Sequence, residues 1–235
     1  MKKGFGNSQD ERWLFRIGGI SAIVLTVGYF LTFPVYAWVG DAPSSGVEAQ
    51  LQYFANHGTG WWIILGLMVF TDLLYIPIFL ALYQSLKSIH KSLMILALAC
   101  EGLFVALDLS LTWTSYSALI LSGIRYTTAA ADAQRAAVVA AAGYPSALLE
   151  SPLLGTYAIL IPSLGILLTG LVMQKGVFYK FTAYLALATG ITGILFITSY
   201  FVDFLGILRI FNALLAMIWF FVIGIRLYRL SRQTE

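Results

Sequence analysis

Charged side chains are scarce in this 235-residue chain. Lys, Arg, Asp and Glu make up 11% of it, whereas hydrophobic residues make up 60%. A water-soluble domain usually contains about 25% charged residues, so the deficit favours lipid over water as the main surroundings of the chain. The formal net charge is +3, and no motif typical of nucleic-acid binding accompanies it. We therefore expect an integral membrane protein that has lipid as a partner and no nucleic-acid partner.

Residues that hold metals, haem or disulfides are also few. The single cysteine, Cys100, excludes an intrachain disulfide and a CxxC site. The two histidines, His57 and His90, fall in loops on opposite sides of the expected bundle, which disfavours a haem pair or a histidine-based metal site. Serine-nucleophile, Walker, dinucleotide and GxGD motifs are absent. We expect no cofactor, no metal and no assigned catalytic residue, and these absences weigh against an enzyme without deciding the question.

Long apolar segments dominate what is present. Each membrane crossing needs about 20 mostly apolar residues, and six segments meet this length. They cover residues 17–39, 61–86, 92–123, 153–174, 181–202 and 207–230. The first exceeds the length of about 7 to 15 residues usual for a signal-peptide core, so it is interpreted as an uncleaved span. The prediction is an all-α, six-helix transmembrane bundle in one domain, 17–230, between an N-terminal segment, 1–16, and a tail, 231–235.

The basic residues predict the orientation of this bundle. Six crossings place both termini on one side, and loops on the cytoplasmic side carry an excess of Lys and Arg. Eleven of the fourteen basic residues fall on the side of the termini: Lys2, Lys3, Arg12, Arg16, Lys87, Lys91, Lys175, Lys180, Arg226, Arg229 and Arg232. Only Arg125, Arg135 and Arg209 fall on the other side. We therefore expect a multi-pass protein of the cell (cytoplasmic) membrane with both termini in the cytoplasm.

The first outer loop contains the pattern of a short amphipathic helix. Ser45 and Glu48 have the spacing of a capping box, in which each side chain bonds the other residue's backbone N–H group. Val47, Leu51 and Phe54 then follow at helical intervals. A helix of this kind is expected to lie on the outer surface with its apolar face against lipid or the bundle.

The second outer loop predicts another short helix. Thr128 can cap an alanine-rich helix that runs through Ala142, and Gly143 with Pro145 is expected to end it. Ser151 and Pro152 have the pattern of an N-cap and first helical position, so the fourth span is expected to begin there.

Five large aromatic residues gather near the predicted outer boundary: Trp38, Trp61, Trp62, Trp113 and Tyr116. Amphipathic aromatic rings are enriched at the headgroup level of membranes. We interpret most of the five as membrane anchors rather than as residues that stack on a ligand.

Two acidic residues lie inside the third apolar segment. Glu101 and Asp108 are seven residues apart, so both fall on one helical face. If spans two and three form a hairpin that turns near residue 89, the helical rise places Asp72 within about 3 Å of Asp108 in height. Glu101 is then about 10 Å deeper along its helix. Ionisable side chains are costly at membrane depth, and they often mark functional sites there.

We therefore predict a polar pocket in the outer half of the bundle. Its expected ligand- or proton-binding residues are Asp72, Glu101, Asp108, Arg209 and Asn212, with hydroxyl groups from Tyr75, Thr112 and Tyr200. Its expected mouth contains His57, Glu150 and Asp203. The alternative is purely structural: Asp108 pairs with Arg209 to lock two helices, while the other buried acids are protonated and hydrogen-bonded.

The second and third spans resemble a bacterial and archaeal family of small six-span membrane proteins, a domain of unknown function. The resemblance is carried by residues 72–77, 82–83 and 99–102, and more loosely by 40–42 and 165–170. It implies the six-span topology and marks Asp72 and Glu101 as family positions. It implies no activity.

Three functions fit these patterns. The first is a transporter-like carrier or a sensor whose outward-facing pocket binds a small molecule, a lipid headgroup or a proton. The second is an accessory subunit that docks onto another membrane protein or onto a second copy of the chain, with the acids serving packing. The third is an intramembrane lipid-modifying enzyme that uses paired carboxylates.

Overall fold

Every element of secondary structure in the described residues is helical. The computed structural model of the chain describes residues 9–43 and 46–232. Its α-helices are α1 (Gln9–Val39), α2 (Val47–Leu107), α3 (Thr114–Thr128), α4 (Asp132–Glu150), α5 (Pro152–Gly155), α6 (Ile161–Met173), α7 (Lys180–Phe196) and α8 (Leu208–Arg232). Two π-helical segments, η1 (Asp108–Trp113) and η2 (Thr156–Leu160), and two 3-10 segments, η3 (Ile197–Tyr200) and η4 (Asp203–Ile207), complete the chain.

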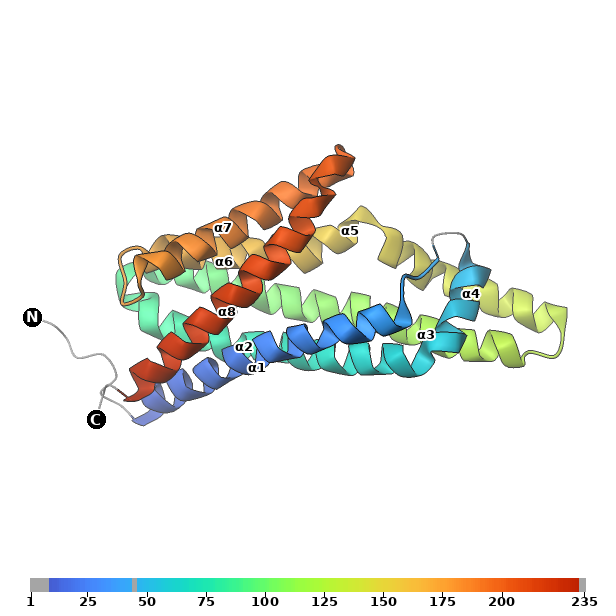
Figure 1. Cartoon of the computed structure of the whole chain (residues 1–235), viewed down its shortest axis with the longest axis horizontal. Helices are drawn as coiled ribbons and strands as arrows, with labels where there is room; N and C mark the ends of the chain where they lie inside the picture. Colours follow the sequence, from blue (N-terminus) through green and yellow to red (C-terminus); the bar gives the residue numbers. More distant parts are fainter. Residues whose placement is uncertain (1–8, 44–45, 233–235) are drawn as a thin grey trace, which may run out of the picture.

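Five helical stretches are long and apolar enough to cross a membrane. The second, Val47–Thr128, is 82 residues long and contains a break in helical geometry at His90, where φ is −153° and ψ is 86°. The chain reverses there, so the two halves of α2 run antiparallel (Figure 1). Trp113 and Asp72 are hydrogen-bonded across this hairpin. The reversal at His90 agrees with the turn expected near residue 89. It divides the 82-residue stretch into two of the six predicted apolar segments.

Two chain reversals and two helix termini lie together at one end of the bundle. The start of α1, the end of α8, the reversal at His90 and the turn between α6 and α7 all lie there (Figure 1). Arg226 fastens this end, because its guanidinium donates to the Val177 carbonyl oxygen at 2.8 Å and lies 5.0 Å from the centre of the Tyr179 ring. The described basic residues expected on the side of the termini belong to these elements.

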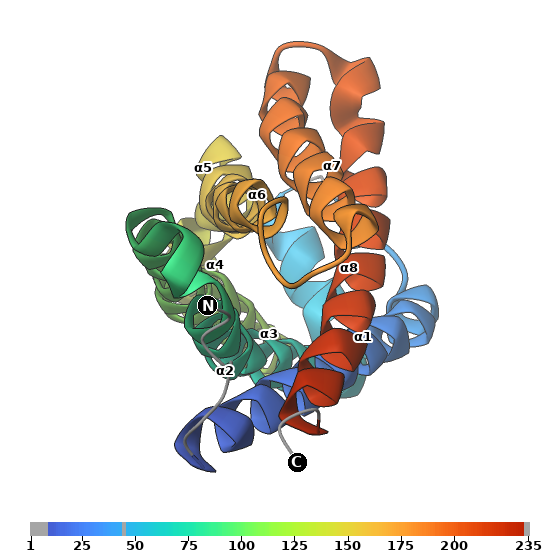
Figure 2. The same ribbon diagram turned by 90° about the vertical axis from the view of Figure 1, so that its left-hand side faces the viewer.

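Helices α1 and α8 cross close to this end and diverge toward the other one (Figures 1 and 2). Two glycines permit the crossing. A Cβ atom on Gly19 would lie 2.7 Å from the Tyr228 backbone nitrogen, and one on Gly224 would lie 3.0 Å from the Gly19 carbonyl oxygen. Small residues at such a contact let two helix backbones approach closely. The divergence beyond the crossing leaves room between α1, α2, α6 and α8 for the cavities described below.

The opposite end is formed by a second cluster of apolar side chains. The helix over residues 47–56 bends away from the rest of α2 at His57 and packs its apolar face on the hairpin of α3 and α4. Leu51 and Phe54 are buried there with Leu119 and Ile120. The amphipathic helix expected in the first loop is therefore present. It begins at Val47 without a side-chain cap bond, and Ser45 lies outside the described residues.

The second loop differs from its predicted form. Thr128 is the last residue of α3 rather than a cap, and α4 begins at Asp132. Helix α4 continues through Gly143 and Pro145 to Glu150, because packing on α3 outweighs the weak helix-stopping signals of these two residues. The expected start of the fourth span is confirmed, since Pro152 is the first residue of α5 and the Leu153 backbone N–H group donates to Ser151 Oγ at 3.2 Å.

The aromatic residues divide into two groups. Trp38 and Trp62 are 65% and 41% exposed, as membrane anchors would be. Trp61 and Trp113 are buried, and Tyr116 stacks on both, with ring centroids 4.7 and 5.7 Å away. The prediction that most of the five residues are anchors is therefore wrong for Trp61, Trp113 and Tyr116. Tyr53 and Phe54 of helix 47–56 pack against Trp61, and Trp113 stacks on Tyr116 and donates to Asp72.

Candidate functional site

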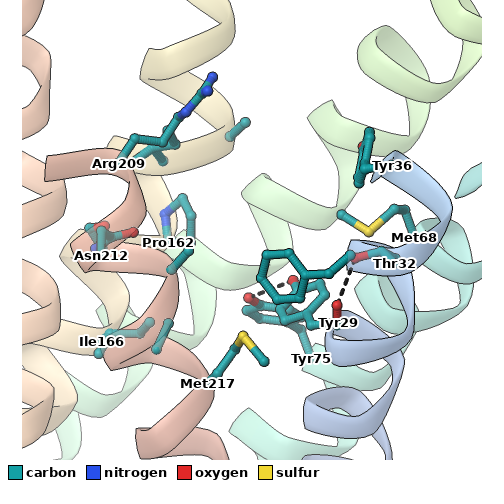
Figure 3. A pocket seen from close by; sticks show the side chains of 16 residues that line it. Tyr29, Thr32, Tyr36, Met68, Tyr75, Pro162, Ile166, Arg209, Asn212 and Met217 are labelled. Carbon is teal, nitrogen blue, oxygen red and sulfur yellow. Dashed lines mark hydrogen bonds between the residues drawn. The ribbon is translucent and has the colours of Figure 1, made fainter. Parts of the chain in front are cut away.

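Two adjoining cavities lie where α1 and α8 have separated. The first, which we call the acidic chamber, has a volume of about 350 Å³ and is lined by Asp72, Asp108, Thr112, Trp113, Tyr116 and Tyr200, among others. The second, which we call the apolar chamber, has a volume of about 270 Å³ and is lined by residues that include Phe33, Ile166, Asn212, Ala213, Ala216 and Met217 (Figure 3). Tyr29, Tyr36, Met68, Tyr75, Ala158, Ile159 and Arg209 line both chambers, which are therefore contiguous.

The acidic chamber is built around two carboxyl groups from neighbouring passages of the chain. Asp72 lies on the first half of α2, and Asp108 is the first residue of the π-helical segment η1. The two side chains are within hydrogen-bonding reach of each other. Both are buried from the outside, at 1% and 5% exposure. The two acids, which the helical rise predicted to lie at a similar height, are thus close enough to share a hydrogen bond.

Local hydrogen bonds hold this pair in place. The Trp113 indole Nε1–H group donates to Asp72 Oδ2 at 2.7 Å, and the Thr112 hydroxyl donates to Asp108 Oδ1. Asp108, Thr112 and Trp113 all belong to η1, and its wider turn brings these three polar or aromatic side chains to the same cavity. The other π-helical segment, η2, contributes Ala158 and Ile159 to the wall. Single π-helical turns are frequent at functional sites.

Two tyrosines stand at the junction of the chambers. The hydroxyl groups of Tyr29 and Tyr75 are 3.1 Å apart and share a hydrogen bond (Figure 3). Tyr29 comes from α1 and Tyr75 from α2. The junction therefore offers polar hydroxyl groups between an acidic space and a largely hydrocarbon one.

Arg209 lines both chambers without neutralising the acids. Within the part of the chain that the structure describes, no ion pair joins Arg209 to Asp72 or Asp108. Its guanidinium points away from the Tyr29–Tyr75 pair (Figure 3). The alternative expectation, an Asp108–Arg209 ion pair that locks two helices together, is therefore not met.

Asn212 connects two helices and also lines the apolar chamber. Its side-chain nitrogen donates to the Thr189 carbonyl oxygen at 2.7 Å, which ties α8 to α7. It does not line the acidic chamber. The amide is thus a helix-connecting group whose remaining surface faces the apolar chamber.

Glu101 lies apart from both chambers. Its side chain is 2% exposed and packs against α6, where a Cβ atom on Gly165 would come within 2.3 Å of Glu101 Oε1. Neither carboxyl oxygen has a hydrogen-bond partner among the described residues. The structure does not place Glu101 in the predicted pocket, because the side chain points into the contact between α2 and α6.

The predicted mouth residues also lie elsewhere. Glu150 accepts a hydrogen bond from Gln50 Nε2 at 2.7 Å beside a separate cavity of about 400 Å³, between helix 47–56 and α4. His57 Nδ1 contacts the Tyr53 carbonyl oxygen at 2.9 Å, at the bend in α2. The side chain of Asp203 lies outside the described residues. The depth predicted from helical rise placed these groups near the outer end of the bundle. It could not show that helix 47–56 and α4 separate them from Asp72 and Asp108.

Several site residues had no role in the sequence-based pocket. Tyr29, Phe33 and Tyr36 of α1 follow a helical i, i+4, i+7 spacing, and all three line the chambers. That aromatic stripe was the available signal, since one helical face carries it. Trp113 was interpreted as an anchor. No pattern in the amino-acid sequence predicted the two π-helical segments.

The bond from Trp113 to Asp72 leads to a specific expectation. Trp113→Phe keeps a ring in the cavity wall but removes the only N–H donor of this side chain, so we expect the free energy of unfolding to fall by about 1 kcal/mol. Thermal unfolding of the purified protein measures the change. Trp62→Phe is the matched control, because Trp62 is 41% exposed and should tolerate the change. Equal melting temperatures for both variants would contradict a stabilising Trp113–Asp72 bond.

The fold and the cavities define a helical bundle with helices long and apolar enough to span a membrane and with a buried pair of acids. Among the described residues, no group of three or more His, Cys, Asp or Glu side chains could hold a metal ion. Comparison with protein-family models, with curated proteins and with solved structures found no match.

Proposed function

We propose that this chain is a six-span membrane protein whose outer-half cavity binds a small molecule, and that it acts as a carrier or a sensor for that ligand. The single observation that carries the proposal is the acidic chamber: about 350 Å³ of space that contains two adjacent carboxyl groups, neither of which forms an ion pair with a described residue. Ligand sites are concave, largely apolar and equipped with a few convergent polar groups. Buried acids at membrane depth are costly unless they serve a partner or a ligand.

The proposed orientation rests on the basic residues. We infer that the end with the start of α1 and the end of α8 faces the cytoplasm, since eleven of the fourteen Lys and Arg residues belong to that side by sequence. The chambers then lie toward the outer face of the cell membrane. The side chains that face outward from α1 and α8 are large and apolar, as lipid contact requires. Docking onto another membrane protein stays a prediction, because these surfaces suit lipid and a partner equally.

The test is the thermal stability of the purified protein against pH and a ligand panel. The panel contains sodium and potassium ions, amines, carboxylic acids and phospholipids in mixed micelles, applied to the wild type and to Asp108→Asn. A ligand that binds only the folded state must raise the melting temperature, and we expect this rise in the wild type and its loss in the variant. Asp132→Asn is the matched control, because Asp132 is fully exposed. If no ligand acts and Asp108→Asn melts lower at every pH, the acids are structural and the proposal fails.

A second candidate function has one specific supporting observation. Asp72 and Asp108 lie within hydrogen-bonding reach of each other, and a carboxyl dyad, in which one group donates and the other accepts a proton, needs this proximity. A lipid-modifying enzyme of this kind would change a vesicle phospholipid during incubation with the wild type but not with Asp108→Asn. Mass spectrometry of the recovered lipid distinguishes this enzyme from a carrier or sensor.

A further inference from the structure

The charge of the acidic chamber restricts what can occupy it. Asp72 and Asp108 contact each other, and Arg209 forms an ion pair with neither of them. When two adjacent carboxyl groups share one proton, the pair carries one negative charge. An anion would add repulsion to this pair, whereas a single positive group that can donate hydrogen bonds would neutralise it.

The other walls of the same chamber suit an organic cation better than a metal ion. Tyr29, Tyr36 and Trp113 line it together with the acids. Aromatic faces attract ammonium groups through the ring quadrupole. A bare metal ion would require a larger set of oxygen ligands at close range, and the described residues contain no such group of acidic or histidine side chains.

The apolar chamber suits a hydrocarbon part of the same ligand. It continues from the acidic chamber past the Tyr29–Tyr75 hydrogen bond, and Phe33, Ile166, Ala216 and Met217 form much of its wall (Figure 3). Its volume of about 270 Å³ is several times that of an ammonium group, which is about the size of one water molecule at roughly 30 Å³. A ligand that uses both chambers has a polar end near the acids and a hydrocarbon part beyond the tyrosines.

From these walls we infer that the ligand is an amphipathic amine, with its ammonium group bound between Asp72 and Asp108 and its hydrocarbon chain in the apolar chamber. The inference rests on the proposed function, since it names the ligand class of that site. Phe33 of α1 lines the apolar chamber and is 50% exposed on the apolar surface of the bundle, so an amphiphile dissolved in the outer leaflet would enter the chamber beside this side chain. The ammonium group then replaces lost water contacts with the carboxyl pair and the ring faces.

The test compares ligands that differ only at the polar end. Binding of decylamine, decanol and decanoate to the purified protein is measured by isothermal titration in one detergent, with propylamine as the headgroup without a tail. The three decyl probes partition differently into micelles because their headgroups differ in charge. The partitioning of each probe is therefore measured in protein-free micelles and its affinity for the protein is corrected for it, so that the remaining differences report the polar end. We expect decylamine to bind at least about tenfold more tightly than the alcohol or the acid, as a charge-assisted contact implies.

Four variants locate the site. Asp72→Asn and Asp108→Asn should each weaken decylamine binding by about tenfold or more, whereas Asp132→Asn should leave it unchanged. Ala216→Phe fills the apolar chamber, so it should weaken decylamine binding and leave the weak propylamine binding unaltered. If one Asn variant does not fold, the other one still tests the carboxyl pair.

The outcomes separate the inference from the proposed function. If decanol or decanoate binds as tightly as decylamine, in a manner that depends on Ala216 but not on Asp72, the cavity binds ligands and the amine inference is overturned. If none of the probes binds, the amine inference is also overturned. The proposed function falls only if the ions, acids and phospholipids of the wider panel have no effect either.

Discussion

Gly19→Ala is expected to lower the free energy of unfolding by about 2 kcal/mol, within the range typical of overpacked contacts. The added Cβ atom would lie 2.7 Å from the Tyr228 backbone nitrogen and 2.9 Å from the Gly224 carbonyl oxygen. Both atoms belong to helix backbone, so the clash is relieved only if α1 and α8 move apart. Thermal unfolding of the purified protein in detergent measures the loss.

Gly66→Ala is the matched control for this substitution. Gly66 is also inside a helix, and a Cβ atom there would meet nothing within 4 Å. Alanine has the higher helix propensity, so this variant should be as stable as the wild type or more stable by up to about 1 kcal/mol. Gly224→Ala should repeat the Gly19 result, since its Cβ atom would lie 3.0 Å from the Gly19 carbonyl oxygen. A Gly19→Ala protein as stable as Gly66→Ala would show that the helices do not cross this closely.

The crossing also bears on ligand binding. The apolar chamber lies between α1 and α8 on the side where they diverge, so a wider crossing changes the spacing of its walls. We expect Gly19→Ala to weaken any ligand response of the cavity although Gly19 lines neither chamber. Gly66→Ala should leave that response intact.

Glu101→Met is expected to raise the free energy of unfolding by about 1 to 3 kcal/mol, which is the usual cost of a buried polar group without a partner. The Glu101 side chain is 2% exposed, and neither oxygen has a hydrogen-bond partner among the described residues. Methionine has a similar length and flexibility, so it can occupy the same space beside Gly165 without polar atoms. The melting temperature of the variant should therefore exceed that of the wild type.

Glu101→Gln separates polarity from shape. The amide keeps two polar atoms in the same buried place, so it should give little of the gain that methionine gives. A Glu101→Met protein less stable than the wild type would contradict the structure, because it would mean that the carboxyl group has a stabilising partner in the folded protein. A stabilised variant that loses ligand response would instead show that Glu101 is kept for function at a cost in stability.

Much of the fold could be predicted from the order of the residues. Apolar runs of the right length indicated the long helices, because a chain with so few charges must bury its backbone polar groups in its own hydrogen bonds. The turn near His90, the Ser151 cap and the amphipathic helix after residue 46 each have local signals that act within a few residues. Helical rise alone brought Asp72 and Asp108 to one level.

Tertiary packing decided the rest, because depth along a helix says nothing about the direction of a side chain or about what covers it. Glu101 and Asp108 share a face in an ideal helix, yet Glu101 packs against α6 while Asp108 opens into the acidic chamber from a π-helical turn. Trp113 looked like a membrane anchor, yet it is buried, stacks on Tyr116 and donates to Asp72. The glycine crossing of α1 and α8, which creates the room for both chambers, depends on two residues that are 205 positions apart and on no local pattern.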